Sequence, residues 1–255
     1  MILVTGATGL LGNCCVRELV ARGEQVRVLV RAGKKRRELD GLNIEIIEGE
    51  LDDEAAIDRA VAGTRAVIHS AALIHIGWTR LEEARRVNVE GTRKIVEACR
   101  RHGSRLIHVS TVDTLPAAID CSLPIDETAS GLPKVECTYV ISKRESEQVV
   151  SDAVQSGLDA VIIHPGFMLA PYDWKPSSGQ MFLGLARMPA AVAPSGSASV
   201  CDARDAAKAI ANSIAHGRRG EHYILGGENI RHGVMDSNVE CDGFEDRESI
   251  ACARV

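Results

Sequence analysis

The sequence is poor in aromatic residues and lacks the features that mark membrane or secreted proteins. Phe, Trp and Tyr make up 3% of its 255 residues, so aliphatic side chains must fill the core. No apolar run approaches the roughly 18 residues of a transmembrane helix, and no charged segment followed by an apolar one marks a signal peptide. We therefore expect a cytoplasmic protein with no membrane partner.

The cysteines lack the spacing of a metal site or a disulfide framework, and the net charge of the chain is small. There are eight cysteines; Cys14 and Cys15 are adjacent, and the others are scattered without a CxxC pair. Such spacing is typical of neither a zinc site nor a disulfide framework, so we predict free thiols and no metal site. The net charge of −5 gives no general attraction to nucleic acid, so no nucleic-acid partner is expected.

What is present is an alternation of short β-rich runs with longer helical patterns up to residue 164. This alternation predicts βαβ units and an α/β fold, a Rossmann-like doubly wound parallel sheet with helices on both faces. The expected strands are Ile2–Thr5, Gln25–Val30, Ile44–Ile47, Ala66–His69, Arg105–Val109 and Ala160–His164, and the expected helices are Leu10–Arg22, Glu54–Val61, Leu81–Arg101 and Glu136–Gln155.

The first strand runs into the segment TGATGLLG, residues 5–12, and a helix follows. Gly6 permits a tight turn, Gly9 lets the backbone approach a pyrophosphate, and Gly12 lets the helix pack closely on the strand. The helix N-terminus adds N–H donors and a positive dipole end. We predict a dinucleotide site formed by Gly6, Thr8, Gly9, Leu10, Leu11 and Gly12.

The chain changes character after residue 164, where five prolines between Pro165 and Pro194 interrupt it. A helix is expected at Ala203–His216 and a last strand at Glu221–Leu225. We assign residues 1–164 to the dinucleotide-binding domain and residues 165–230 to a small C-terminal substrate lobe interleaved with it. Residues 231–255 are acidic and without period, which predicts an atypical, disordered tail.

Tyr139 and Lys143 lie one turn apart on an expected helix. A phenol has a pKa of about 10, which is too high for easy proton exchange at neutral pH. A neighbouring lysine ammonium favours the phenolate, and it can also hydrogen-bond the nicotinamide ribose. Because Tyr139 and Lys143 occur in a chain that begins with a dinucleotide-binding loop, we interpret them as a catalytic pair that also contacts the cofactor.

The GxxGxxG spacing, the YxxxK segment and three further motifs occur in the order that resembles the extended and atypical short-chain dehydrogenase/reductase superfamily. The resemblance covers roughly residues 1 to 227. It implies that Thr111, after the fifth strand, is the catalytic hydroxyl, and that Asn88 and His164 are structural. It also adds to the cofactor-binding set Glu50, Leu51, Ala71, Ala72, Pro165 and Gly166.

The end of the second strand bears on the choice of cofactor. An acidic residue there binds the ribose 2′-hydroxyl of NAD, whereas an arginine pairs with the 2′-phosphate of NADP. Arg31 occupies this position, and Lys34 or Lys35 could add charge, although residues 35–37 are more typical of a solvated helix start. We therefore expect NADP(H) in preference to NAD(H), and NAD(H) stays open.

The resemblance implies an NAD(P)-dependent oxidoreductase that transfers hydride between nicotinamide and a small-molecule ketone or secondary alcohol. Dihydroflavonol-reductase-like and 3β-hydroxysteroid-dehydrogenase-like members look most similar. An NAD-dependent nucleotide-sugar epimerase/dehydratase and a non-catalytic NADP(H)-binding regulator are the alternatives. The resemblance also suggests a homodimer formed through Leu81–Arg101 and Glu136–Gln155. Six residues either line the substrate pocket or fill the lobe: His75, Trp78, Phe167, Met168, Tyr172 and Trp174.

Overall fold

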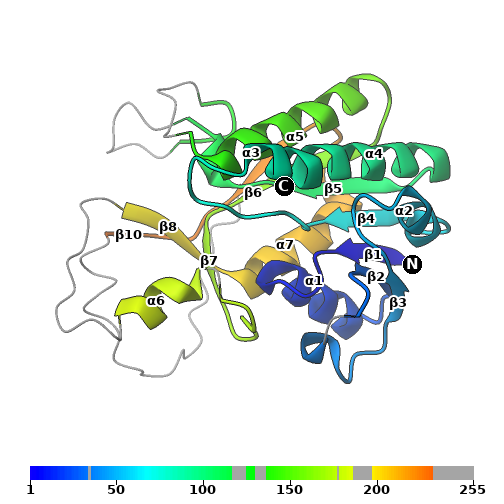
Figure 1. Cartoon of the computed structure of the whole chain (residues 1–255), viewed down its shortest axis with the longest axis horizontal. Helices are drawn as coiled ribbons and strands as arrows, with labels where there is room; N and C mark the ends of the chain where they lie inside the picture. The colour runs from blue at the N-terminus through cyan, green and yellow to red at the C-terminus, as the bar shows by residue number, and fades with distance from the viewer. Residues whose placement is uncertain (34–35, 117–124, 130–135, 177, 186–196, 232–255) are drawn as a thin grey trace.

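The computed structural model of the chain describes residues 1–33, 36–116, 125–129, 136–176, 178–185 and 197–231. Its centre is a seven-stranded sheet in the order β3-β2-β1-β4-β5-β6-β9, in which all neighbours are parallel (Figure 1). The expected Rossmann-like doubly wound fold is thereby confirmed. The strands are β1 (Ile2–Thr5), β2 (Val26–Val30), β3 (Glu45–Glu48), β4 (Ala66–His69), β5 (Arg105–Val109), β6 (Ala160–Pro165) and β9 (His222–Leu225).

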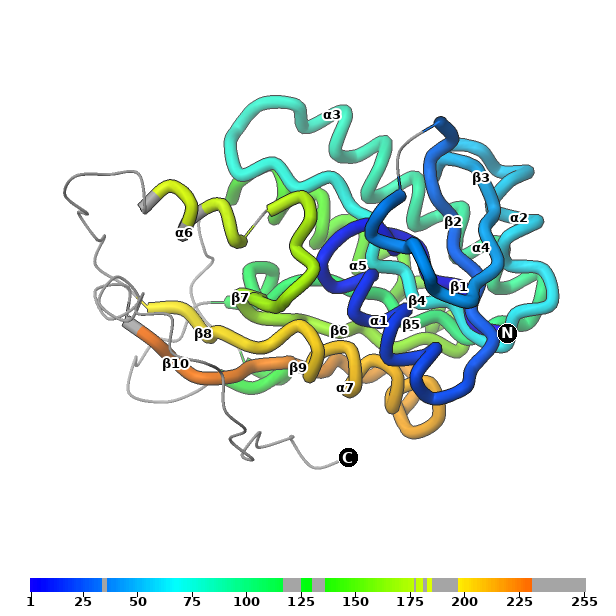
Figure 2. The backbone as a smooth tube through the Cα atoms, turned by 90° about the horizontal axis from the view of Figure 1, so that it is seen from below, coloured from blue at the N-terminus to red at the C-terminus, as the bar shows by residue number. Residues whose placement is uncertain are grey.

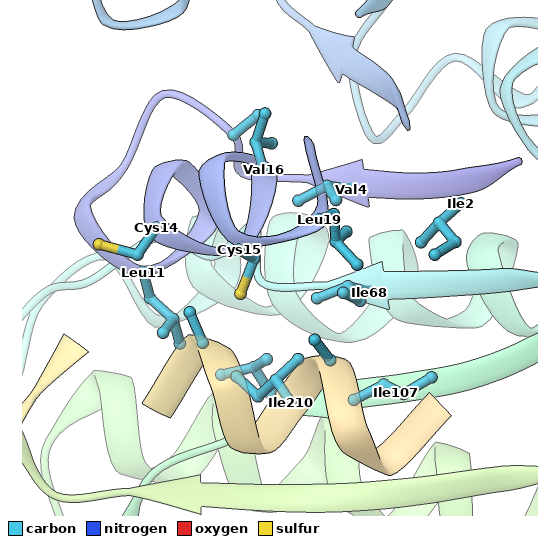
Figure 3. Packing of buried hydrophobic residues seen from close by; sticks show 14 of the residues in the cluster. Ile2, Val4, Leu11, Cys14, Cys15, Val16, Leu19, Ile68, Ile107 and Ile210 are labelled. Atoms are coloured by element: carbon cyan, nitrogen blue, oxygen red, sulfur yellow. The ribbon is translucent and has the colours of Figure 1, made fainter. Parts of the chain in front are cut away.

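Helices cover both faces of this sheet. α1 (Leu10–Ala21) and α7 (Ala203–His216) pack on one face, and α2 (Glu54–Val61), α4 (Gly91–His102) and α5 (Thr138–Gln155) pack on the other. Successive strand residues therefore enter different cores, as in β1, where Val4 faces α1 and α7 while Leu3 faces the other layer. Figure 3 shows Leu11 and Cys15 of α1 pointing toward Ile210 of α7.

The helix expected at Leu81–Arg101 is divided into three consecutive stretches. α3 (Leu81–Ala84) leads into a π-helical stretch, η2 (Arg85–Glu90), and α4 follows directly. The wider turn contains Asn88, whose side-chain amide donates to the Leu73 carbonyl over 3.0 Å and whose Oδ1 accepts from the Leu73 N–H over 2.7 Å. Helical spacing alone does not reveal such a bulge, because it arises from these contacts with a distant loop.

A second sheet, in the order β10-β8-β7, lies beyond the carboxyl end of β6. It consists of β7 (Phe167–Leu169), β8 (Ser197–Asp202) and β10 (Glu228–Arg231), and α6 (Gly179–Leu185) lies at the same end of the molecule (Figure 2). Short turns of helix occur at η1 (Arg37–Leu39) and η3 (Val112–Thr114). β10 includes Arg231, the first residue of the expected tail, and residues 232–255 lie outside the described part of the chain.

The described cysteines, Cys14, Cys15, Cys99, Cys137 and Cys201, are buried free thiols. Cys121, Cys241 and Cys252 lie outside the described residues. Among the helices of the described ranges, none is both long and apolar enough to cross a membrane.

Candidate active site

The glycine loop lies where the direction of strand order reverses, between β1 and its neighbours β2 and β4. Gly6 has a φ of +72°, and a Cβ there would lie 2.7 Å from the backbone nitrogen of Ala71. A Cβ at Gly12 would lie 2.2 Å from the carbonyl oxygen of Gly6. Neither position admits a side chain, so β1, β4 and α1 approach one another more closely than other residues allow.

The same loop leaves the start of α1 free to bind an anion. Gly9 is the N-cap of α1 and supplies no side-chain acceptor, and the first turn of the helix contains no acidic residue. Thr8 and Leu10 are partly exposed, whereas Leu11 is buried in the core. Helix N–H groups directed at the edge of a parallel sheet fit a dinucleotide pyrophosphate. The loop therefore fits the group for which it is predicted.

Other predicted cofactor residues lie along the same edge of the sheet. Arg31 is exposed directly after β2, and Glu50 is exposed after β3 with the half-buried Leu51 beside it. Ala71 follows β4, and its N–H donates to the Thr5 hydroxyl over 3.3 Å. Ala72, next in sequence, is half-buried. Lys34 and Lys35 lie outside the described residues.

At the far end of this edge, Pro165 is the last residue of β6 and is buried. Gly166 donates its N–H to the carbonyl of Leu225 over 3.0 Å. A Cβ at Gly166 would lie 2.5 Å from the carbonyl oxygen of Ser199, so this glycine allows β8 to approach the turn. The turn thus joins the large sheet to the small one beside the predicted nicotinamide site.

The structure brings the three predicted catalytic residues to the junction of α5 and the end of β5. Lys143 is 3% exposed, and its Nζ donates to the Val109 carbonyl over 2.8 Å and lies 3.3 Å from His108 Nε2. Tyr139 lies one turn earlier on the same helix. Thr111 is buried at the start of η3, where its hydroxyl accepts from the Asp113 N–H and lies 3.2 Å from the Asp113 carboxylate.

The electrostatics of the pair depend on burial. Burial lowers the pKa of Lys143 from 10.5 to about 8, although the charge of Glu147 opposes this shift. Burial raises the pKa of Tyr139 well above its usual value, and the charges of Asp113 and Glu147 act in the same direction. Near neutral pH the phenol of Tyr139 is therefore protonated, which is the state of a proton donor, and Lys143, one helical turn away, carries an ammonium.

Sequence reasoning missed Glu147, Asp113 and the contacts of Ser110 near this site. Ser110 donates a hydrogen bond to the carboxylate of Glu147, which lies one turn after Lys143 on α5. The spacing of Tyr139, Lys143 and Glu147 at intervals of four residues was a signal for one helix face. Nothing in the local sequence indicates that Asp113 reaches Thr111.

Of the six residues expected to line the pocket or fill the lobe, none belongs to the fully buried core. Trp78 is 79% exposed and Trp174 is 56% exposed. Tyr172 stacks beneath the Arg17 guanidinium, 3.9 Å from the ring centroid, and has a φ of +73°. His75 hydrogen-bonds Thr79 over 2.9 Å. Phe167 and Met168 are half-buried in β7.

Comparison with known proteins agrees with this geometry. The model of the NAD dependent epimerase/dehydratase family matches residues 2–226. The chain is 36% identical over 239 residues to a sterol demethylase protein B of Methylococcus capsulatus, covering 91% of this chain and 71% of the relative. It is 35% identical to a 2-alkyl-3-oxoalkanoate reductase of Stenotrophomonas maltophilia, over 68% of this chain and 52% of that protein.

Solved structures show the same similarity. A UDP-glucose 4-epimerase of Thermus thermophilus in complex with NAD superimposes with a TM-score of 0.78 at 25% identity, covering 92% of this chain and 81% of that one. The fold and site thus define an enzyme of the short-chain dehydrogenase/reductase type that uses a nicotinamide dinucleotide. The chain belongs to the NAD dependent epimerase/dehydratase family.

Proposed function

We propose that the protein is an NADP(H)-dependent reductase that interconverts a ketone and a secondary alcohol, with Tyr139 as the proton donor and Lys143 as its partner. The observation that supports this most is the seating of Lys143. Its ammonium is held by the Val109 carbonyl at the end of β5, one helical turn from Tyr139 and close to the strand end that carries Thr111.

Each of these side chains has a separate task in the proposed reaction. When bound, the nicotinamide supplies the hydride, and the glycine loop holds the pyrophosphate. Tyr139 gives its proton to the developing alkoxide oxygen, and the Lys143 ammonium stabilises the resulting phenolate. Thr111 donates a hydrogen bond to the same oxygen once its hydroxyl turns from Asp113.

The preference for NADP(H) is supported by Arg31. It follows β2 directly, its side chain is exposed, and its carbonyl accepts a long hydrogen bond from Arg36 (3.4 Å). An exposed guanidinium at this point forms a bidentate pair with a 2′-phosphate.

An apolar segment beside Tyr139 supports a ketone with a large apolar skeleton. Ile74, Ile76 and Trp78 are 56%, 73% and 79% exposed in the segment after β4. This segment is tied to the start of α5, because the Thr138 N–H donates to the Gly77 carbonyl over 2.7 Å. Clustered exposed apolar side chains mark binding surfaces. The names of the two relatives mention sterols, which are alcohols with a large apolar skeleton, and 2-alkyl-3-oxoalkanoates, which are ketones with apolar chains.

Binding and turnover measurements test the proposal. Cofactor fluorescence is expected to show tighter binding of NADPH than of NADH. Arg31→Asp should weaken NADPH binding about tenfold or more, whereas Arg37→Asp, an exposed arginine on η1, should change it little. NADPH oxidation is then followed with progesterone as an apolar ketone and with dihydroxyacetone as a hydrophilic one, and the steroid is expected to react faster.

Tyr139→Phe removes only the phenol hydroxyl. It should lower turnover by about a hundredfold or more while NADPH binding stays unchanged. NAD that remains bound through purification, or a preference for NADH, would contradict the proposal and favour a nucleotide-sugar epimerase/dehydratase. NADPH binding without turnover of any ketone would favour a regulator. The expected homodimer stays a prediction that sedimentation can test.

A further inference from the structure

A group of buried polar side chains lies behind the proposed catalytic pair and has no role in the reaction described above. His164, in β6, is fully buried, and its Nδ1 lies 3.1 Å from the Thr111 carbonyl and 3.8 Å from Glu147 Oε1. Its Nε2 lies 2.8 Å from Nδ1 of His222, in β9. β9 is the last strand of the sheet, and His222 is partly exposed there. We call His164 and His222 the imidazole pair.

The hydrogen bonds determine which nitrogens of the pair carry protons. A carbonyl oxygen only accepts, so the Nδ1 that faces the Thr111 carbonyl carries a proton. The Thr114 hydroxyl, 3.2 Å from the same nitrogen, donates to the Thr111 carbonyl over 2.8 Å and is therefore free to accept from this Nδ1. In a neutral His164 the Nε2 is then an acceptor, and Nδ1 of His222 must donate to it. Nε2 of a neutral His222 is left unprotonated at the partly exposed edge of the sheet, where it can take a proton from solvent.

The pair and Glu147 together connect this edge to the proposed proton donor. Glu147 lies one helical turn after Lys143, which lies one turn after Tyr139. The Glu147 side chain is 14% exposed, and it accepts a hydrogen bond from Ser110, the neighbour of Thr111. Nδ1 of His164 lies 3.8 Å from Glu147 Oε1, a gap that a small side-chain rotation or one water molecule closes. Lys143 and Glu147 lie four residues apart on α5, a spacing that places them on one face of the helix.

We infer that Glu147, His164 and His222 form a route that returns a proton from solvent to Tyr139 after each reduction. This inference rests on the proposed reductase function. For each ketone reduced, Tyr139 loses one proton to the alkoxide oxygen and regains one from the Lys143 ammonium. Glu147 returns a proton to the Lys143 amine, the imidazole pair returns one to the carboxylate, and solvent reprotonates His222. The sum is one proton moved from solvent to the alcohol.

The proton affinities of these groups suit the task. Burial raises the pKa of Glu147, although hydrogen bonds from Ser110 and Thr114 oppose the shift, so its carboxylate accepts a proton more readily than an exposed carboxylate does. Burial lowers the pKa of both His164 and His222, so a proton that reaches either ring is passed on readily.

The charged and titratable groups that face the imidazole pair come from several elements. Glu147 and Lys143 face it from α5, and His108 faces it from β5. Glu127, whose carboxylate accepts from the Ile224 N–H over 2.7 Å, faces it from the segment before α5. Glu221 lies next to His222 in sequence. The carboxylates raise the pKa of the rings, whereas the Lys143 ammonium lowers the pKa of His164. These opposing effects leave protonation of the pair accessible.

A magnetic resonance measurement tests the tautomers without cofactor or substrate. In the full chain with isotopically labelled imidazole nitrogens, His164 and His222 should both be protonated at Nδ1 near neutral pH, with coupling across the Nε2 to Nδ1 hydrogen bond. Acidification should first protonate Nε2 of His222. A pair in which His222 is protonated only at Nε2, with no coupling, would overturn the inference.

The kinetic test uses variants that keep the fold. His222→Asn retains a donor toward His164 but cannot relay a proton, and Glu147→Gln retains an acceptor for Ser110 but cannot donate a carboxylic proton. With NADPH and progesterone, His222→Asn should complete the first turnover at the wild-type rate and then slow about tenfold or more. Glu147→Gln also removes a charge that acts on Tyr139 and Lys143, so its later turnovers should slow about tenfold or more relative to its own first turnover. A third variant, His222→Ala, leaves space for a free imidazole and should slow in the same way as His222→Asn. Added imidazole should restore its steady-state rate but not that of Glu147→Gln. His216→Ala, an exposed histidine at the end of α7, is the control and should behave as wild type.

The outcomes separate this inference from the proposed function. If wild type does not oxidise NADPH with any ketone, the reductase proposal fails. The tautomer measurement still tests whether His164 and His222 are protonated as inferred. If wild type turns over and the steady-state rates of both variants equal it, the proton route is wrong. A loss already present in the first turnover and not restored by imidazole would show that these residues act only by holding the strands together.

Discussion

Replacing Lys143 by methionine tests the burial of the ammonium through the pH dependence of stability. Burial lowers the pKa of this lysine from 10.5 to about 8, so the unfolded chain binds the proton more tightly than the native protein does. The native state therefore carries a penalty that is fully present below about pH 8 and is relieved as the pH rises toward 10.5. Methionine keeps most of the length of the side chain and removes the penalty.

The magnitude follows from the two pKa values. With a native pKa of about 8 and an unfolded pKa of 10.5, the penalty is about 3 kcal/mol at pH 8 and about 1.5 kcal/mol at pH 9.5. The difference in unfolding free energy between wild type and Lys143→Met should thus shift by about 1.5 kcal/mol in favour of wild type over this interval. Buried thiols such as Cys14 and Cys201, whose pKa burial raises to about 11, lower stability above about pH 9 in both proteins and cancel in the difference.

Urea unfolding of the cofactor-free protein at several pH values in this interval measures the difference. Lys208→Met removes an exposed ammonium from α7 and should follow wild type in parallel. Parallel curves for Lys143→Met as well would refute the reasoning, because they would mean that the native and unfolded states bind the Lys143 proton equally well.

Three further substitutions, one of them a control, test the cofactor loop and the contact between Lys175 and Glu38. Gly12→Ala places a methyl group 2.2 Å from the Gly6 carbonyl and should weaken NADPH binding more than tenfold in a fluorescence titration. Gly23→Ala strains a positive φ in open space and should cost about 1 kcal/mol of stability with binding intact; equal affinities in both variants would contradict the assignment. Lys175→Met removes the partner of Glu38, whose Oε1 lies 2.6 Å from Nζ and whose side chain is 5% exposed. Burial alone would raise the pKa of Glu38, but the Lys175 hydrogen bond holds it below its usual 4.5. The loss of about 1 kcal/mol should therefore be seen in thermal unfolding near neutral pH and disappear as acid protonates Glu38; a loss equally large in acid would contradict this.

Much of the fold was predictable because its signals are local. The strands β1, β4 and β5 have the expected bounds, since short apolar runs between turn residues determine them. The bounds of β3 differ by one residue from the expected strand, within the usual uncertainty at element ends. The small sheet was not predicted, because β8 and β10 pair across a separation that no local pattern reveals.

The candidate site also combines features with a local sequence signal and features that depend on long-range contacts. Its glycine loop and the Tyr139–Lys143 spacing are properties of short segments, so both can be predicted from the sequence. The grouping of Glu147 with His164 and His222 cannot, because these residues lie on separate elements that only the packing of the sheet and α5 brings together.

The strand and helix pattern, the glycine turn and the helical spacing of Tyr139 and Lys143 can all be predicted from short stretches of sequence. Periodicity and local backbone geometry carry these signals. The binding of the Lys143 ammonium by the end of β5, and the position of an acid and two imidazoles near it, arise from tertiary packing. Those contacts depend on how α5 packs across β5, β6 and β9, and the side chains that meet there come from segments far apart in the chain.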